Sequence, residues 1–164
     1  MFKKSVFFAS LLFLSGCSNQ STFGLFQNDI LYEKGLDYSR VGHIINSFET
    51  KAIINATYLN STDVDKYDDE FHNFLVGIYI TEDNEKETQK YLENTKYVLT
   101  LNDKGIDKRE DLNSTNYFWE HIPLKNPYAK YYIVSFKKVE NLHSLSLKYE
   151  HTNLGKVILS FQGE

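Results

Sequence analysis

The chain has 164 residues, a formal net charge of −4, and an aromatic fraction of 15%, with 12 Tyr and 12 Phe. The length suits a single domain, and with only two Pro and no Pro/Gly-rich tract the composition indicates a folded chain rather than a disordered one. The acidic balance and the lack of a basic cluster argue against nucleic-acid partners and against adsorption to anionic lipid headgroups.

An export signal opens the chain. Two lysines precede an apolar run over residues 5–14, and Leu14-Ser15-Gly16-Cys17 matches the lipobox that directs lipid attachment to a cysteine. The run is too short for a membrane-spanning helix, which needs about 20 apolar residues. An ordinary small-x-small cleavage site fits poorly because Leu14 is bulky. The sequence therefore predicts a signal peptide over residues 1–16, cleavage before Cys17 and acylation of Cys17.

The cysteine count and the following residues refine this prediction. Cys17 is the only Cys in the chain, so an oxidising export route offers it no disulfide partner within the molecule. Ser18, rather than Asp, follows it, which favours sorting to the outer membrane without fixing the leaflet. We expect residues 17–22 to form a lipidated tether and residues 23–164 a single domain. Loss of the two signal-peptide lysines takes the net charge from −4 to −6.

Residues 23–48 are compatible with two structures. The apolar positions fit one face of a short helix capped by Ser39, or a strand that runs into Lys51. Crowded β-branched residues and Gly42, which weakens a helix, favour a strand or hairpin. The apolar positions concerned are Val41, Ile44, Ile45 and Phe48.

From Lys51 onward the chain reads as short strands separated by polar loops. Alternation is cleanest in the fifth strand, where Leu145, Leu147 and Tyr149 share one face, as in a strand with its other face solvated. The second strand is apolar on both faces, as expected of a central strand. A turn signal, Asn102-Asp103-Lys104-Gly105, follows the third. The six predicted strands are Lys51–Asn60, Asn73–Ile80, Tyr97–Leu101, Lys130–Phe136, Ser144–Tyr149 and Lys156–Phe161.

These elements predict an all-β fold, an antiparallel immunoglobulin-like β-sandwich of about six to eight strands. The Cys…Trp…Cys signature of antibody domains is absent, so the prediction concerns architecture only. Five segments resemble a group of small, mostly uncharacterised lipoproteins of epsilon-type proteobacteria. This resemblance implies a β-sandwich at the cell envelope with a role in surface attachment or adhesion, and it transfers no functional residue. The segments are ATYLN (Ala56–Asn60), FLVGIYI (Phe74–Ile80), YVLTLN (Tyr97–Asn102), KYYIVSF (Lys130–Phe136) and LGKVILSF (Leu154–Phe161).

The sequence patterns offer little support for a metal or cofactor site. Residues 63–70 carry five carboxylates, but without a Gly at the turn and with Lys66 among them they miss the EF-hand pattern, so a solvated acidic loop is favoured. Residues 81–94 form a second polar loop. The five His have neither i, i+4 spacing nor Cys companions, so we expect no metal site and no cofactor. The five are His43, His72, His121, His143 and His151.

The sequence lacks a nucleophile elbow, a phosphate-binding Gly loop and a nucleophile with an evident base, so we expect no enzymatic activity. Tyr117-Phe118-Trp119 puts three aromatics in a row, which could anchor a protein partner or stack on a sugar. The alternative, favoured because Trp is highly buried on average, is that a loop crossing the sandwich packs Phe118 and Trp119 over one open end.

Asn113 is a candidate glycosylation site. It has Asp111 two residues before it and Thr115 two residues after it, as in the extended acidic-x-Asn-x-Ser/Thr sequon of bacterial N-glycosylation. Asn55 and Asn60 also begin sequons but lack the acid, and Asn55 falls in a predicted strand.

Together these features predict a lipid-anchored, non-catalytic interaction or adhesion module at the outer membrane. The membrane is its first partner, through the lipid on Cys17. A protein or a glycan is the second, and nucleic acid is not expected. The alternative is an accessory subunit of an envelope assembly complex, held on the periplasmic side and bound to its partner through a sheet edge.

Overall fold

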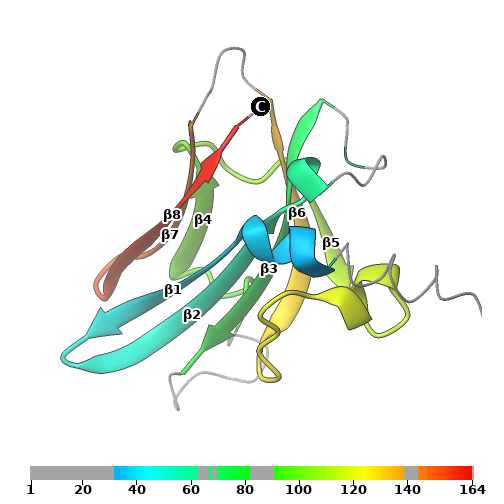
Figure 1. Ribbon diagram of the computed structural model, residues 1–164. Helices are drawn as coiled ribbons and strands as arrows, with labels where there is room; N and C mark the ends of the chain where they lie inside the picture. Colours follow the sequence, from blue (N-terminus) through cyan, green and yellow to red (C-terminus); the bar gives the residue numbers. More distant parts are fainter. Residues whose placement is uncertain (1–31, 63–66, 68–69, 82–90, 139–143, 164) are drawn as a thin grey trace, which may run out of the picture.

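Two antiparallel sheets face each other in the computed structural model, which describes residues 32–62, 67, 70–81, 91–138 and 144–163 (Figure 1). The predicted all-β class is confirmed. The five-stranded sheet has the order β1 (Ser39–Asn46), β2 (Glu49–Tyr58), β3 (Phe71–Ile80), β6 (Lys130–Lys137) and β5 (Lys108–Leu112). The three-stranded sheet has the order β4 (Tyr97–Leu101), β7 (Ser144–His151) and β8 (Gly155–Gln162).

Short helices fill some of the connections. A helix over residues 32–37 precedes β1, and the 3-10 helices η1 (Asn60–Thr62) and η4 (Tyr117–His121) lie further along the chain. Within the predicted segment 23–48, the favoured strand or hairpin is confirmed for residues 39–48, because β1 and β2 pair along their length, whereas residues 32–37 are helical and residues 23–31 lie outside the described residues. Ser39 does not begin a helix but follows one, and its Oγ donates a hydrogen bond of 2.6 Å to the carbonyl of Gly35. It thereby satisfies one of the carbonyls that a helix end leaves without a partner.

Hydrophobic patterning located six strands to within two residues at every end. It missed β1 as a defined strand and β5 altogether. The sequence of β5, Lys-Arg-Glu-Asp-Leu, has four charged residues of five and no apolar alternation. Such a strand forms because β6 supplies the hydrogen-bonding partner, and its charges suit an edge position, where they discourage pairing with another chain.

The main core lies between the sheets. From β3, Phe74, Val76, Ile78 and Ile80 point inward, and Leu145, Leu147 and Tyr149 of β7 meet them from the other sheet. Aromatic rings join the layers: the Phe74 and Phe161 centroids are 5.2 Å apart, edge to face. β3 is the middle strand of its sheet and is buried on both faces, as its sequence predicted.

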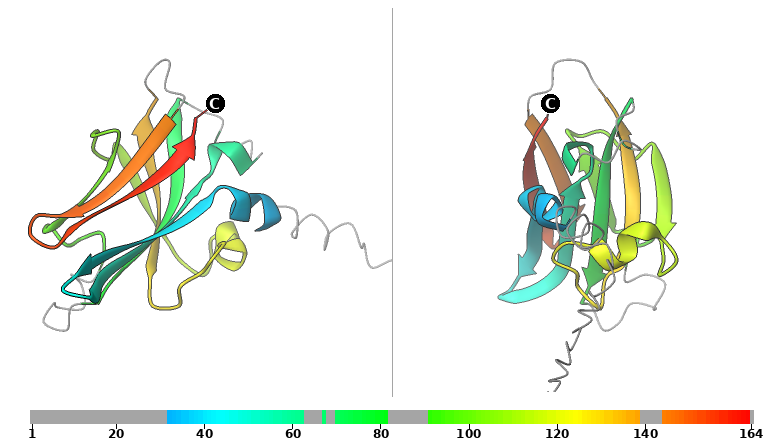
Figure 2. Two further views of the ribbon diagram at one scale, coloured as in Figure 1. Left: turned by 60° about the vertical axis from the view of Figure 1, so that its left-hand side comes forward. Right: turned by 45° about the vertical axis from the view of Figure 1, so that its right-hand side comes forward.

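The sandwich closes where β1 meets β8, and Gly42 permits the close approach. A Cβ at this position would lie 2.4 Å from Val157 Cγ2 and 2.8 Å from Leu159 Cδ2. The two edge strands therefore pack side by side without hydrogen bonding as one sheet (Figure 2). At the opposite side, the turn after β4 leads to β5, and Glu93, in the segment before β4, pairs with Lys130 and Arg109 of the five-stranded sheet.

Candidate interaction surface

The outer face of the five-stranded sheet has a cluster of its own. Leu75, Ile133 and Tyr131 project from β3 and β6 on the side away from the main core. The connection over residues 113–129 crosses above them and supplies Trp119 and Ile122. The helix over residues 32–37 packs on this connection, because a Cβ on Gly35 would lie 2.7 Å from Pro123 Cγ.

Trp119, one of the predicted patch residues, lies within this cover. It is half-buried, and its ring meets Tyr131 edge-on, with centroids 6.3 Å apart. Lys125 covers another side, with Nζ 4.1 Å from the ring centroid and 3.0 Å from the Trp119 carbonyl oxygen. Tyr117 and Phe118 belong to η4, but their side chains lie outside the described residues. This placement agrees with the packing alternative for Trp119, although the loop covers a sheet face rather than an open end.

A strip of apolar side chains adjoins the cover; Val41, Leu124 and Tyr128 are exposed, and Ile53 and Tyr79 are half-buried. We name Val41, Ile53, Tyr79, Leu124 and Tyr128 the outer strip. Ile53 and Tyr79 are paired across β2 and β3, and the rings of Tyr79 and Tyr128 are 5.8 Å apart. Tyr128 is 69% exposed and Leu124 46%. Contiguous apolar groups on an otherwise polar surface are typical of sites that bind another molecule.

A hydrogen bond to a backbone carbonyl attaches the loop that carries Leu124 to the sheet. The Asn55 side-chain amide donates a hydrogen bond to the Leu124 carbonyl, which fixes the loop to β2. Leu124 has φ 51°, a conformation that bulky L-residues rarely adopt. The loop is thus held in a strained form that leaves a leucine in solvent, and such strain is a reason to ask for a functional role.

Only part of this surface was recognisable from the sequence. Tyr128, Tyr131 and Tyr132 follow the predicted aromatic run, but β6 buries the last two and leaves only the first exposed. Val41, Ile53 and Tyr79 come from three different strands, so only strand pairing brings them together.

A second cluster, of charged groups, lies at the open side of the sandwich. Lys130 Nζ is 2.8 Å from Asp111 Oδ2 and 3.0 Å from Glu93 Oε1, and Arg109 lies 3.6 Å from Asp111. The buried Tyr132 donates a hydrogen bond of 2.8 Å to Glu93. A hollow of about 430 Å³ opens beside them, lined by residues that include Leu92, Tyr97 and Ile106.

Protonation in this cluster follows its contacts. Partial burial alone would raise the pKa of Glu93, but hydrogen bonds from Tyr132 and Lys130 outweigh it and lower that pKa. Burial opposes the charge on Lys130, yet its bonds to Asp111 and Glu93 raise its pKa. Burial, with Glu93 as acceptor, raises the pKa of Tyr132. Glu93 therefore stays negatively charged, Lys130 positively charged and Tyr132 neutral. Charged side chains at the edge of a sheet discourage pairing with another chain.

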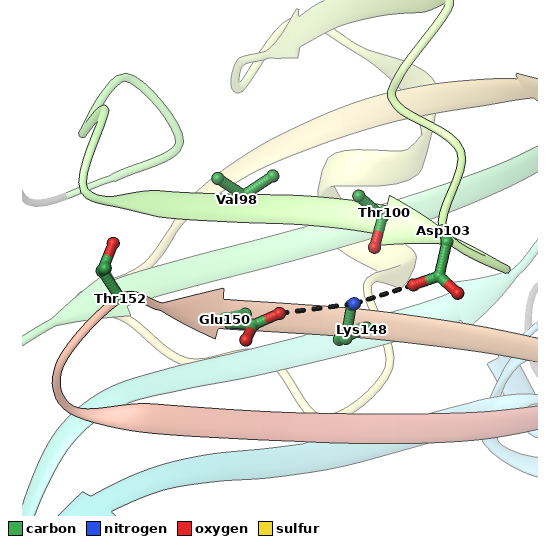
Figure 3. A pocket seen from close by; sticks show the side chains of 6 residues that line it. All are labelled: Val98, Thr100, Asp103, Lys148, Glu150 and Thr152. Carbon is green, nitrogen blue, oxygen red and sulfur yellow. Dashed lines mark hydrogen bonds and ion pairs between the residues drawn. The ribbon is translucent and has the colours of Figure 1, made fainter.

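Figure 3 shows a third region, a shallow hollow of about 360 Å³ on the outer face of the three-stranded sheet. Lys148 lies at its centre, with Nζ 2.8 Å from Asp103 Oδ1 and 3.3 Å from Glu150 Oε2. These two carboxylates raise the pKa of Lys148, so it stays positively charged and paired. The Thr100 hydroxyl is buried and has no hydrogen-bond partner within the described part of the chain. The lining carries one ammonium and two carboxylates, a formal net charge of −1, and its single cation is already paired with both carboxylates.

The predicted sequons differ in accessibility. Asn113 is exposed directly after β5, and its Oδ1 accepts hydrogen bonds from the Thr115 amide (3.0 Å) and hydroxyl (2.6 Å). Asn55 is buried in β2, and Asn60 donates through Nδ2 to the carbonyls of Tyr67 and Phe71. Cys17 lies outside the described residues, so its lipidation stays a prediction.

The His residues and acidic loops are dispersed. His72 and His151 are buried on different sheets, His43 is exposed and His121 half-buried. His143 and most of the two acidic loops, residues 63–70 and 81–94, lie outside the described residues. Across the described ranges, three or more His, Cys, Asp or Glu side chains are nowhere grouped so as to hold a metal ion.

Comparisons with protein-family models, curated proteins and solved structures gave no significant match. Within the residues that the structure describes, no helix has the length and apolar character needed to cross a bilayer.

Proposed function

We propose that this protein is a lipid-anchored, non-catalytic interaction module of the bacterial outer membrane, and that it binds a protein partner through the outer strip. The observation that carries the proposal is the exposure of Leu124 and Tyr128 beside Tyr79, on a loop fixed to the sheet by Asn55. Mixed aliphatic and aromatic groups with a polar rim are typical of the centre of a protein interface.

The proposed fold is an immunoglobulin-like sandwich with one added strand at the N-terminus. In the constant-type immunoglobulin order, the first, second, fifth and fourth strands form one sheet and the third, sixth and seventh the other. With β1 set aside, the sheets here are β2-β3-β6-β5 and β4-β7-β8. Counted from β2, this is the same order. The match supports the proposal, and rigid sandwiches of this kind carry recognition on surface loops such as residues 113–129.

The proposed anchor is the lipid on Cys17. The basic residues, short apolar run and lipobox support it, as does the solitary cysteine. Mass spectrometry of the protein purified from its membrane tests it: we expect an acylated Cys17 as the first residue. An unmodified thiol, or a chain that retains residues 1–16, would contradict it.

The strip is tested by crosslinking and pulldown of the lipoprotein from intact cells. We compare the native chain with a Leu124→Ser/Tyr128→Ser double variant. The matched control is Val98→Ser/Ile158→Ser, which removes two exposed apolar side chains from the other sheet. A protein partner captured by the native chain and the control but not by the strip variant supports the proposal. Equal capture by all three, or capture of glycan alone, contradicts it.

Whole-cell protease treatment separates adhesion from the assembly-subunit alternative. An adhesin must be cleaved on intact cells, whereas a periplasmic subunit must be protected until the outer membrane is opened. In the second case the captured partner is an envelope complex.

Asn113 is proposed as a glycan acceptor because it is exposed and carries the full acidic sequon. We expect the native chain to carry a mass increment that disappears with Asn113→Gln and persists with Asn60→Gln.

A further inference from the structure

The turn between β1 and β2 has a conformation that its residues disfavour. Asn46 pairs with Glu49, so Ser47 and Phe48 form a two-residue hairpin loop. Their φ angles are 52° and 66°, the left-handed region required at both positions of a type I′ turn. Asn and Gly are the usual residues there, because a side chain with a Cβ is strained in this region. A phenylalanine is an unusual choice.

The strain is not offset by packing. Phe48 is fully exposed, and the neighbouring Ile45 is 62% exposed. The turn after β4 provides a comparison within the same molecule: Asn102 and Asp103 have φ 46° and 63°, and both are polar residues that tolerate this conformation. Where only a turn is needed, the chain uses the expected residues. At the β1–β2 turn it places a large apolar side chain in solvent.

The tip extends past the end of β3. Pairing of β2 with β3 begins at Ala52, so residues 46–49 lie beyond it (Figure 1). Asn46 Nδ2 donates a hydrogen bond of 3.5 Å to the Leu154 carbonyl, while Ser47 and Phe48 are exposed. Glu49 and Lys51 form an ion pair of 2.6 Å, and the other residues of the turn are uncharged. The tip therefore presents two exposed apolar side chains, Phe48 and Ile45, and carries no net charge.

We propose that Phe48 and Ile45 insert into the surface of the membrane that holds the lipid anchor, as a second contact that orients the domain. The proposal rests on the proposed anchorage at Cys17. Fourteen residues lie between Cys17 and residue 32, and this chain can extend over at most about 50 Å. That distance exceeds the roughly 33 Å length of β2, so the chain between the anchor and the described domain is long enough for the tip to reach the bilayer.

Tethering also makes a weak contact effective. One apolar side chain gives only marginal membrane affinity, but an attached domain meets the bilayer at high effective concentration. The neutral tip and the acidic chain suit zwitterionic headgroups rather than anionic ones.

The first experiment attaches the protein without relying on natural lipidation. The chain without residues 1–16 is coupled through Cys17, its only thiol, to a maleimide lipid in phosphatidylethanolamine/phosphatidylcholine vesicles. The reporter is Phe48→Trp in a Trp119→Phe background. We expect its emission to shift to the blue and to be quenched by lipids with brominated acyl chains. The control reporter, Val98→Trp on the other sheet, is expected to show neither effect.

A second comparison separates strain from insertion. Phe48→Gly and Ser47→Gly each relieve a left-handed residue, so both are expected to raise Tm. Only Phe48→Gly removes the apolar group, so only it is expected to weaken cosedimentation of the uncoupled chain with the same vesicles, by about tenfold.

An unquenched Phe48→Trp reporter on coupled vesicles overturns the proposal. So does concentration-dependent dimerisation in solution that Phe48→Gly abolishes, because the tip would then bind a second copy. Absence of natural acylation in the mass spectrum contradicts the anchor alone and leaves the vesicle result interpretable.

Discussion

The two faces of the five-stranded sheet are covered in different ways. The inner face packs against a whole second sheet, and one cluster of buried side chains joins the two, with members that include Ile44 of β1 and Phe161 of β8. The outer face is covered by one connection, residues 113–129, and by the helix over residues 32–37. That cover extends over Leu75, Tyr131 and Ile133 and ends beside Val41, Ile53 and Tyr79, where its own Leu124 and Tyr128 are exposed. The outer strip thus lies at the border between the cover and the part of the sheet that the cover leaves open.

The largest expected difference is between two isoleucines. Ile78 lies in the inner cluster and Ile133 in the outer one. We expect Ile78→Ala to cost about 4 kcal/mol and Ile133→Ala about 2 kcal/mol, because a loop cover can collapse into the cavity more easily than two facing sheets. Urea unfolding of both variants measures the free energies. Equal losses would mean that the two covers are equally rigid.

Gly77→Ala tests the joint between β3 and the outer cover. The added Cβ would lie 2.3 Å from Cε1 of the buried Tyr131 ring, so the ring must move. Its hydroxyl accepts the Asn126 amide at 2.6 Å, and the loop would move with it. We expect a loss of about 1–3 kcal/mol and a red shift of Trp119 emission. Gly105→Ala is the control, since a Cβ there meets nothing within 4 Å. An unshifted emission spectrum would mean that the loop carrying Trp119 does not move with the Tyr131 ring.

Lowering the pH is expected to destabilise the protein first through His72, on the inner face of the five-stranded sheet. Burial, aided by Lys138, lowers the pKa of His72 below its ordinary value of 6.5, while a hydrogen bond of 2.9 Å joins its Nδ1 to Tyr58. Below pH 6.5 the unfolded chain takes up a proton that the folded chain resists, so stability falls as pH falls towards the lower folded pKa. We expect an effect smaller than that of Gly77→Ala. His72→Phe, which cannot take up a proton, should flatten the slope of urea-unfolding free energy between pH 6.5 and 5.

Protonation of Glu93 is expected to lower the free energy of unfolding over a second, lower range of pH. Its folded pKa is lowered, so its contribution is present above pH 4.5 and is lost as pH falls through the folded value. Because the carboxylate is partly exposed, we expect less than about 1 kcal/mol. Glu93→Gln should remove this window and leave the one from His72 intact. If Glu93→Gln removed both pH windows, the protonation of Glu93 and that of His72 would be coupled.

The smallest effect is expected in the outer strip. Tyr128 is mostly exposed, so Tyr128→Ser should change the free energy of unfolding by no more than about 0.5 kcal/mol. Thermal unfolding checks this value. A loss above about 1 kcal/mol would mean that Tyr128 packs as part of the cover, and the contrast between the covered and open parts of the outer face would then fail.

Local patterning by itself determined most of the strands. Alternation in β7 and the apolar sequence of β3 reflect which faces are buried, and burial is written into residue type along a single strand. The Asn-Asp turn was likewise readable, because left-handed φ angles select these residues. The N-terminal lipobox is a linear motif and needs no fold to be recognised.

Tertiary structure decided what local patterning could not. β5 carries no hydrophobic signal, and its pairing with β6 is what makes it a strand. Trp119 was prominent in the sequence, yet Tyr131 and Lys125 partly cover it. Val41, Ile53 and Tyr79 are unremarkable in isolation and become one surface only through strand register. Whether a side chain is exposed depends on what packs against it from elsewhere in the chain, and that information is not local.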